Sequence, residues 1–275
     1  MRRIGFIGLS VLLLSSCRPN NVKIDTSLQS YFTDNKVKGV FALFNNGTGK
    51  IIVSDRDRYF DSTYVPASTF KIVNSLIGLQ EGKISSDTMM IRWDGVERNR
   101  PDWNQDLTMI QAFRVSSLPY YQEVARRIGQ KRMQFWLDSL GYGQRYEKPV
   151  LTGPIDSFWL NGVVKVTPDE QLGLVRRLYF NELPFFHLYQ ESVKKAMLFE
   201  DSTTYQLSYK TGWSFWDEKE NRHVAWITGW IVENKHPYFF VQLIESSDKD
   251  LDMPAVRMKI LKGILKQLGF LEGKM

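Results

Sequence analysis

A serine and a lysine three positions apart form the pair best suited to chemistry in this chain. Ser68 and Lys71 lie in the segment Pro66-Ala67-Ser68-Thr69-Phe70-Lys71. Side chains three residues apart on a helix share a face, so this hydroxyl and this amine can meet. If Ser68 begins the helix, the free N–H groups and the dipole there stabilise negative charge on an attacked carbonyl oxygen. The pair predicts acyl transfer, with Ser68 as the nucleophile and Lys71 as its base.

A lysine accepts a proton only when its amine is neutral. Burial of Lys71 beside the positive end of a helix would lower its pKa from about 10.4 toward neutrality. The spacing Ser-x-x-Lys is common by chance, however, and an N-cap serine followed by a solvated lysine gives the same pattern. Other motifs must decide between these two interpretations.

Two further motifs favour the chemical interpretation. Ser116-Ser117-Leu118 lies in the helical middle of the chain, and Lys210-Thr211-Gly212 lies at the end of a strand predicted over residues 205–210. β-Lactamases and penicillin-binding proteins combine a Ser-x-x-Lys, a second serine motif and a Lys-Thr-Gly triplet. All three occur here, each in the expected setting of helix start, helical region and late strand.

With these motifs the chain resembles the class D serine β-lactamases, from about residue 25 to residue 271. Several of the shared motifs are absent from the other serine β-lactamase classes. The motifs that carry the resemblance are Tyr64-Val65-Pro66-Ala67-Ser68-Thr69-Phe70-Lys71, Trp93-Asp94-Gly95, Trp103-Asn104-Gln105-Asp106, Phe113-Arg114-Val115-Ser116, Phe158-Trp159-Leu160 and Lys210-Thr211-Gly212-Trp213.

The resemblance implies a role for each matching residue. Ser68 would be acylated, and Lys71 would react with carbon dioxide to give N6-carboxylysine, the general base for acylation and deacylation. Trp159 would donate its indole N–H to that carboxyl group. Ser116 would pass a proton to the leaving nitrogen, assisted by Lys210.

The resemblance also implies the residues that bind substrate. Thr211 and Arg257 would hold the substrate carboxylate, with Gly212 next to Thr211 in the Lys-Thr-Gly triplet. The backbone N–H groups of Ser68 and Trp213 would form the oxyanion hole. Leu118 departs from the family, which has valine there, and it places a bulkier side chain against the modified lysine. Tyr142-Gly143-Gln144 replaces the family's Tyr-Gly-Asn, and we assign that triplet to structure.

The helices and strands that must position these residues can be predicted from hydrophobic periodicity and from the residues that begin and end such elements. The strands are predicted over residues 39–44, 50–54, 205–210, 223–232 and 238–245. The helices are predicted over residues 68–80, 131–140, 167–180 and 254–268. The fold class is therefore α+β: strands from both chain ends share one antiparallel sheet, flanked by helices, with an inserted helical subdomain.

The composition excludes several kinds of function. Hydrophobic residues make up 43% and charged residues 24%, as in an ordinary globular protein. The net charge of +6 is scattered, with no basic stripe interleaved with aromatics, so nucleic acid is not an expected partner. His187, His223 and His236 lie far apart in sequence, which argues against a zinc site. No cofactor is expected beyond carbon dioxide or bicarbonate for Lys71.

The N-terminus predicts export. Arg2 and Arg3 precede an apolar run over residues 4–14, which is too short to span a bilayer and is typical of a signal peptide. The sequence Leu14-Ser15-Ser16-Cys17 at the end of this run resembles a lipoprotein cleavage box, and Cys17 is the only cysteine. We expect a signal peptide over residues 1–16, a tether over 17–24 and the enzyme domain over 25–275. The mature protein would lie on the periplasmic side, held to a membrane only by lipid on Cys17. A buried thiol is the alternative.

Three functions remain open at this point. The first is hydrolysis of small-molecule β-lactams by a monomer or homodimer, which would confer antibiotic resistance. The second is a penicillin-binding transpeptidase or carboxypeptidase, and the third is a β-lactam-sensing domain. Trp159 favours the hydrolase, because a carboxylated lysine would provide the base that deacylation requires.

Overall fold

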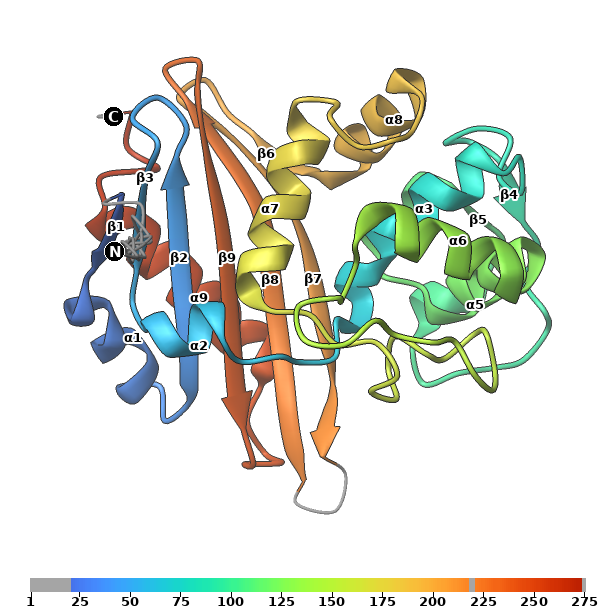
Figure 1. Ribbon diagram of the computed structural model, residues 1–275, viewed down its shortest axis with the longest axis horizontal. Coiled ribbons are helices and arrows are strands. Elements are labelled where there is room, and N and C mark those ends of the chain that lie inside the picture. Colours follow the sequence, from blue (N-terminus) through green and yellow to red (C-terminus); the bar gives the residue numbers. More distant parts are fainter. Residues whose placement is uncertain (1–20, 218–220, 274–275) are drawn as a thin grey trace, which may run out of the picture.

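The computed structural model describes residues 21–217 and 221–273 of the chain (Figure 1). The predicted signal peptide and Cys17 lie outside the described residues. The strands are β1 (Val22–Ile24), β2 (Lys38–Asn45), β3 (Lys50–Val53), β4 (Met90–Ile91), β5 (Leu107–Thr108), β6 (Leu198–Asp201), β7 (Tyr205–Asp217), β8 (Arg222–Glu233) and β9 (His236–Ser246). The α-helices are α1 (Ser30–Thr33), α2 (Arg56–Phe60), α3 (Lys71–Gln80), α4 (Met109–Arg114), α5 (Leu118–Ile128), α6 (Gln130–Leu140), α7 (Pro168–Tyr179), α8 (His187–Met197) and α9 (Met253–Gln267). The 3-10 helices are η1 (Thr26–Gln29), η2 (Ala67–Phe70) and η3 (Pro101–Trp103).

The central sheet joins the two ends of the chain, as the sequence predicted. Its order is β1-β3-β2-β9-β8-β7-β6, so N-terminal strands pair with C-terminal ones through β2 and β9. The pairs are antiparallel except β1 and β3, which run parallel. Residues 22–24, which we had assigned to the tether, form β1, because Val22 to Ile24 pair with Ile51 to Val53. The prediction was therefore wrong for these three residues, which belong to the folded domain.

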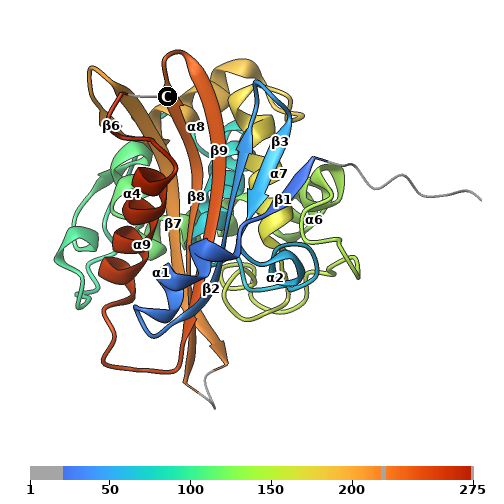
Figure 2. The ribbon, with the colours of Figure 1, turned by 90° about the vertical axis from the view of Figure 1, so that its left-hand side faces the viewer.

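Helices cover both faces of this sheet. Figure 2 shows α1 and α9 on one face and α2 and α7 on the other. The predicted last helix is confirmed as α9, and its Ile260, Leu261 and Ile264 are fully buried against the sheet. A second and larger core lies between the opposite face and the remaining helices. The α+β layers predicted from the sequence are thus the observed ones.

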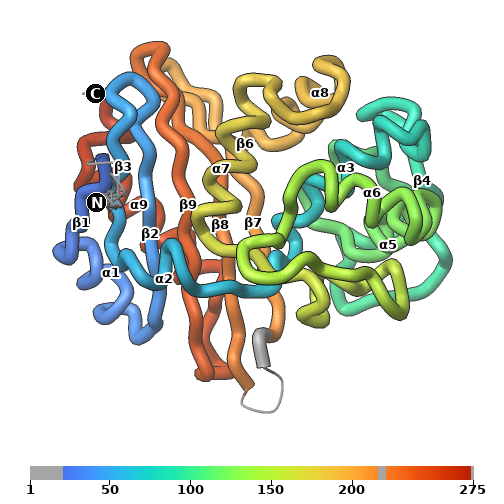
Figure 3. Tube along the Cα trace, in the orientation of Figure 1, coloured from blue at the N-terminus to red at the C-terminus, as the bar shows by residue number. Residues whose placement is uncertain are grey.

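The middle of the chain forms the inserted helical subdomain. Helices α3, α5 and α6 lie beyond the β7 side of the sheet (Figures 1 and 3). The stop predicted at Gly141 is confirmed, since this residue ends α6 in the left-handed conformation with φ of 65°. The start predicted at Thr167 is also confirmed, since its side chain and that of Glu170 form a capping box on α7.

Strand β7 is longer than predicted. We expected it to end at Lys210, but it continues to Asp217 because β8 pairs with it over its whole length. The Lys-Thr-Gly triplet therefore lies in the middle of a strand. On the other side, β6 pairs with β7 only between Gln206 and Ser208. Beyond Ser208 that edge of β7 faces η2, which carries the predicted nucleophile.

Among the described residues, no helix has the length and apolar character needed to cross a membrane.

Candidate active site

The predicted nucleophile lies on a strained turn. Ala67, the residue before Ser68, has a φ of 49°, which is a costly conformation for a residue with a Cβ. Three hydrogen bonds hold the turn. Ala67 N donates to Trp159 O at 3.1 Å, Thr69 Oγ1 donates to Pro66 O at 2.6 Å, and Gln171 Nε2 donates to Thr69 Oγ1 at 2.7 Å. They fix the half-buried Ser68 at the start of η2, with α3 continuing the same helix.

Strand β7 approaches this turn at Gly212. A Cβ at that position would lie 3.1 Å from Pro66 O and 3.3 Å from Ser68 N. A larger side chain would therefore push the strand away from the nucleophile. The glycine of the Lys-Thr-Gly motif is needed for this close approach of two backbones.

Lys71 meets Ser68 as the sequence predicted. Its Nζ lies 2.7 Å from Ser68 Oγ, and its side chain is only 1% exposed. Burial, aided by the positive charge of Arg100, lowers the pKa of Lys71 to about 7. The ring of Tyr121 faces the amine at 5.5 Å from its centroid. At neutral pH a substantial fraction of the amine is therefore neutral and can accept the hydroxyl proton.

The second serine motif meets the Lys-Thr-Gly motif in the same cleft. Ser116 has a φ of 57° in the turn between α4 and α5, and its Oγ accepts a hydrogen bond from Lys210 Nζ at 3.0 Å. Lys210 also donates to Thr211 O at 2.9 Å and is 1% exposed. Burial, followed by repulsion from Lys71 and Arg257, holds the pKa of Lys210 well below its usual range. Two buried amines thus each face one serine hydroxyl.

Trp159 fits a carboxyl group on Lys71. Its side chain is 1% exposed and stacks on Phe70, with the ring centroids 5.4 Å apart. Its indole N–H is buried without a hydrogen-bond partner in the described part of the chain. A buried donor without an acceptor is costly, so an acceptor in this space would stabilise the fold. The predicted donor is therefore free to bind such a group.

Arg257 and Trp213 lie beside the same strand. Arg257 reaches β7 from α9 and donates from Nη1 to Gly212 O at 2.7 Å, whereas its buried Nε has no hydrogen-bond partner among the described residues. Burial lowers its pKa to about 10. Trp213 is 48% exposed, and its ring stacks on His223 at 5.9 Å between centroids. Thr211 is half-buried and lies two residues before Trp213 on β7.

Leu118 lies at the first position of α5. Its side chain is partly buried and packs against the larger core. Tyr142, in the triplet that we assigned to structure, contacts Phe70 with ring centroids 5.7 Å apart. The same triplet needs its glycine, because Gly143 has a φ of 72° and a Cβ there would lie 2.7 Å from Lys165 O.

The sequence analysis assigned no role to three residues that surround the two amines. Tyr121 faces Lys71, Phe113 faces Lys210 with its ring centroid 5.3 Å from Nζ, and Arg100 acts on Lys71 by its charge. Phe113 belongs to one of the motifs shared with the family, but no function had been predicted for it. No spacing pattern in the sequence marks an aromatic ring or a loop arginine as part of a site formed by distant segments.

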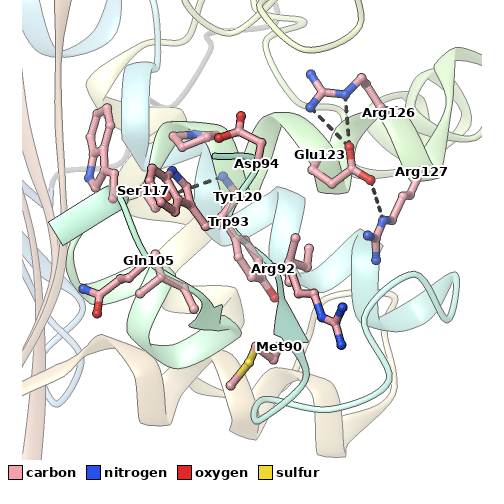
Figure 4. A pocket seen from close by; sticks show the side chains of 14 residues that line it. Met90, Arg92, Trp93, Asp94, Gln105, Ser117, Tyr120, Glu123, Arg126 and Arg127 are labelled. Carbon is pink, nitrogen blue, oxygen red and sulfur yellow. Dashed lines mark hydrogen bonds and ion pairs between the residues drawn. The ribbon is translucent and has the colours of Figure 1, made fainter. Parts of the chain in front are cut away.

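A separate cavity of about 340 Å³ lies in the helical subdomain (Figure 4). Trp93, Trp103 and Tyr120 contribute to its walls, and none of the predicted site residues lines it. At its rim Arg126 and Arg127 both converge on Glu123. Its lining also includes Ser117, the neighbour of Ser116, so the cavity adjoins the second serine motif.

Over residues 21–217 and 221–273, no group of three His, Cys, Asp or Glu side chains could hold a metal ion.

Comparison with known proteins gives consistent matches. Residues 29–266 match the family model described as the penicillin binding protein transpeptidase domain. Beta-lactamase OXA-48 of Klebsiella pneumoniae is 35% identical over 246 residues, which cover 88% of this chain and 87% of that protein. Beta-lactamase OXA-10 of Pseudomonas aeruginosa is 33% identical over 261 residues, with 95% and 96% covered. The solved class D β-lactamase YbXI from Nostoc superposes with a TM-score of 0.82 at 34% identity, covering 90% of this chain and 100% of that chain.

The buried lysine should destabilise the folded protein below neutral pH. The pKa of Lys71 is about 7 when folded and about 10.4 when unfolded, so between these values the unfolded state binds more protons and stability rises with pH. We expect Lys71→Met to raise the free energy of unfolding by on the order of 2–5 kcal/mol at pH 6, and by less at pH 9. Urea denaturation in buffer freed of carbon dioxide measures both values. A variant no more stable than wild type at pH 6 would show that the amine is not destabilised by burial.

Proposed function

The chain belongs to the class D β-lactamases, which share the penicillin-binding transpeptidase domain, and on this basis we propose that it hydrolyses the amide bond of β-lactam antibiotics. Such an activity would confer antibiotic resistance. The observation that carries the proposal is the pairing of two buried amines with two serine hydroxyls, Lys71 with Ser68 at 2.7 Å and Lys210 with Ser116 at 3.0 Å.

Acylation begins at Ser68. Its Oγ attacks the lactam carbonyl carbon, and its proton moves to Lys71, whose Nζ lies 2.7 Å from that oxygen and which we assign, in its carboxylated form, as the base for acylation as well as deacylation. The carbon–nitrogen bond of the lactam then breaks, and the proton reaches the leaving nitrogen by way of the Ser116 hydroxyl. Lys210 orients that hydroxyl by its hydrogen bond. The product is an ester on Ser68.

Hydrolysis of that ester requires a base for the attacking water. We assign this role to Lys71 carrying a carboxyl group derived from carbon dioxide. Two observations support the assignment: burial favours the neutral amine that reacts with carbon dioxide, and the Trp159 N–H is a buried donor without a partner in the described structure. When present, the carboxylate supplies a general base within reach of Ser68. Leu118, in place of the family's valine, leaves less room for that group.

The substrate binds along the open edge of β7. We assign its carboxylate to Thr211 and Arg257, because the guanidinium is already directed toward the carbonyl of Gly212, the neighbour of Thr211. The backbone N–H groups of Ser68 and Trp213 form the oxyanion hole, which is consistent with the close approach at Gly212. The exposed ring of Trp213 forms one wall of the cleft.

Two related functions use the same residues without fast deacylation. A penicillin-binding transpeptidase or carboxypeptidase, or a β-lactam sensor, would form the ester on Ser68 and release it slowly. The unpartnered Trp159 N–H favours the hydrolase, since it provides for the base that deacylation needs. The rate of ester release therefore distinguishes the three functions.

We further propose that the protein is exported and held on the periplasmic side of a membrane through lipid on Cys17. The support is the sequence alone: a short apolar run after Arg2 and Arg3, followed directly by the only cysteine. The described domain begins only a few residues later, with β1 starting at Val22. The anchor would hold the enzyme close to the membrane surface.

Substitution of the nucleophile tests the proposed reaction. We expect Ser68→Ala to lower benzylpenicillin hydrolysis by at least about a thousandfold and to abolish covalent labelling by a fluorescent penicillin. Thermal unfolding of the variant provides the control that the domain still folds. Wild-type protein that is labelled but does not turn over would support the sensor or the transpeptidase. Undiminished labelling of the variant would remove Ser68 as the nucleophile.

Removal of the indole N–H tests the base. Trp159→Phe keeps a ring on Phe70 and deletes only the donor, so a carboxyl group on Lys71 would lose one hydrogen bond. Such a loss costs roughly 1.5–3 kcal/mol, or about ten- to more than a hundredfold in occupancy. We expect acyl-enzyme to accumulate in rapid-quench mass spectrometry and to decrease when bicarbonate is added. Trp136→Phe, which deletes an indole N–H bonded to Glu81, is the matched control. Equal deacylation rates in Trp159→Phe and wild type, both indifferent to bicarbonate, would leave an unmodified lysine as the base.

Substitution of the cysteine tests the anchor. Cys17→Ser should move the protein from the membrane fraction to the soluble fraction of expressing cells without change in specific activity, because Cys17 precedes the whole described domain. Fractionation and a nitrocefin assay of both fractions measure this. Membrane association as strong as that of wild type would exclude Cys17 as the attachment site.

A further inference from the structure

Arg100 lies close to the second serine motif, to which Trp103 connects it. It comes from the loop between β4 and β5, and its guanidinium carbon lies 5.0 Å from the ring centroid of Trp103. Trp103 is fixed in turn, because its Nε1 donates to Val115 O at 3.1 Å. Val115 directly precedes Ser116, whose hydroxyl accepts a hydrogen bond from Lys210. This series of contacts holds the cation next to the second serine motif.

The charge of Arg100 is not neutralised by its surroundings. In the described part of the chain its ion-pair partner is Asp102 at 3.6 Å, with both side chains 52% exposed. An exposed pair at that distance is weak. Two other carboxylates of the loop have their own partners: Asp94 pairs with Arg98 at 2.6 Å, and Asp106 accepts from the backbone of Trp93. Donors of the guanidinium therefore remain available to a ligand.

The same charge reaches the reacting groups. After burial, Arg100 is the cause that lowers the pKa of Lys71. The contacts through Trp103 and Val115 bring the guanidinium to the side of the cleft that carries the second serine motif, which is consistent with this effect. Arg100 thus belongs to the helical wall, whereas Arg257 reaches the cleft from the sheet through β7.

We propose that Arg100 and Trp103 form a second anion-binding position in this cleft, which favours β-lactams whose side chain carries an acidic group in addition to the ring carboxylate. The proposal rests on the proposed hydrolase function and adds a substrate class to it. Arg257 and Thr211 serve the ring carboxylate on the sheet side. The planar guanidinium of Arg100, with its carbon 5.0 Å from the indole centroid of Trp103, offers paired donors to a second carboxylate or sulfonate.

Two penicillins that differ by one carboxylate provide the test. Carbenicillin is benzylpenicillin with a carboxyl group on its side chain. The second-order rate constant of acylation is measured for each by competition with a fluorescent penicillin, so the readout does not depend on deacylation. We expect Arg100→Gln to lower the carbenicillin constant about tenfold and to change the benzylpenicillin constant less than threefold. Arg100→Lys should retain part of the preference.

A second arginine of the same loop is the matched control. Arg92 is exposed and lines the separate cavity of Figure 4, so Arg92→Gln removes the same charge at a different place. We expect it to change both constants less than threefold and to leave their ratio as in wild type. An equal loss for both penicillins in Arg100→Gln, or the same change in ratio in Arg92→Gln, would overturn the proposal. Wild-type protein that neither penicillin acylates would instead refute the proposed function itself.

The pH profile gives a readout that a merely structural role would not change. Lys71 is faced by the hydroxyl of Ser68 and the ring of Tyr121, and its charge interacts with that of Lys210 on β7. Loss of the positive charge at Arg100 lets the pKa of Lys71 rise. On the acidic side of its pH profile, the rate constant of benzylpenicillin acylation falls as Lys71 is protonated. We expect this fall to move to higher pH in Arg100→Gln and to stay where it is in Arg92→Gln. An unchanged profile in Arg100→Gln would show that the guanidinium does not reach the cleft.

Discussion

Two buried lysine amines in one cleft set the conditions for the rest of the site. Lys71 and Lys210 are each 1% exposed, and burial penalises their charged forms. They also repel each other, which lowers the pKa of Lys210 further. Each amine has a serine hydroxyl as its hydrogen-bond partner, and a carboxylate would be the better one. Burial of these two amines lowers the stability of the folded protein, and in return it makes them more reactive than solvated lysines.

The backbone around the amines is built to hold this unfavourable arrangement. Ala67 and Ser116 both adopt positive φ, which costs on the order of 1–3 kcal/mol each and persists only when neighbours enforce it. Ala67 is held by the Trp159 carbonyl, and Gly212 lets β7 pass close to the same turn. The helical subdomain and the sheet are therefore joined at the nucleophile, and neither half contains a complete site.

The sequence predicted the parts of this arrangement that local chemistry determines. The capping box at Thr167, the left-handed stop at Gly141 and the meeting of Ser68 with Lys71 follow from short-range rules, and the structure contains all three. The length of β7 was underestimated because its partner β8 determines it. Arg100 was missed because its place depends on contacts with Trp103 and the distant Lys71, which leave no pattern in sequence.

The central claim is that burial and a nearby cation keep much of the Lys71 amine neutral at physiological pH, the form that can react with carbon dioxide and so provide the base for Ser68. The most direct measurement is an NMR titration of the Lys71 side chain, with its resonance assigned by comparison with Lys71→Met and carbon dioxide excluded from the buffer. We expect a midpoint near pH 7, because burial lowers the pKa of this amine to about 7. A midpoint above pH 10, as for a solvated lysine, would contradict it.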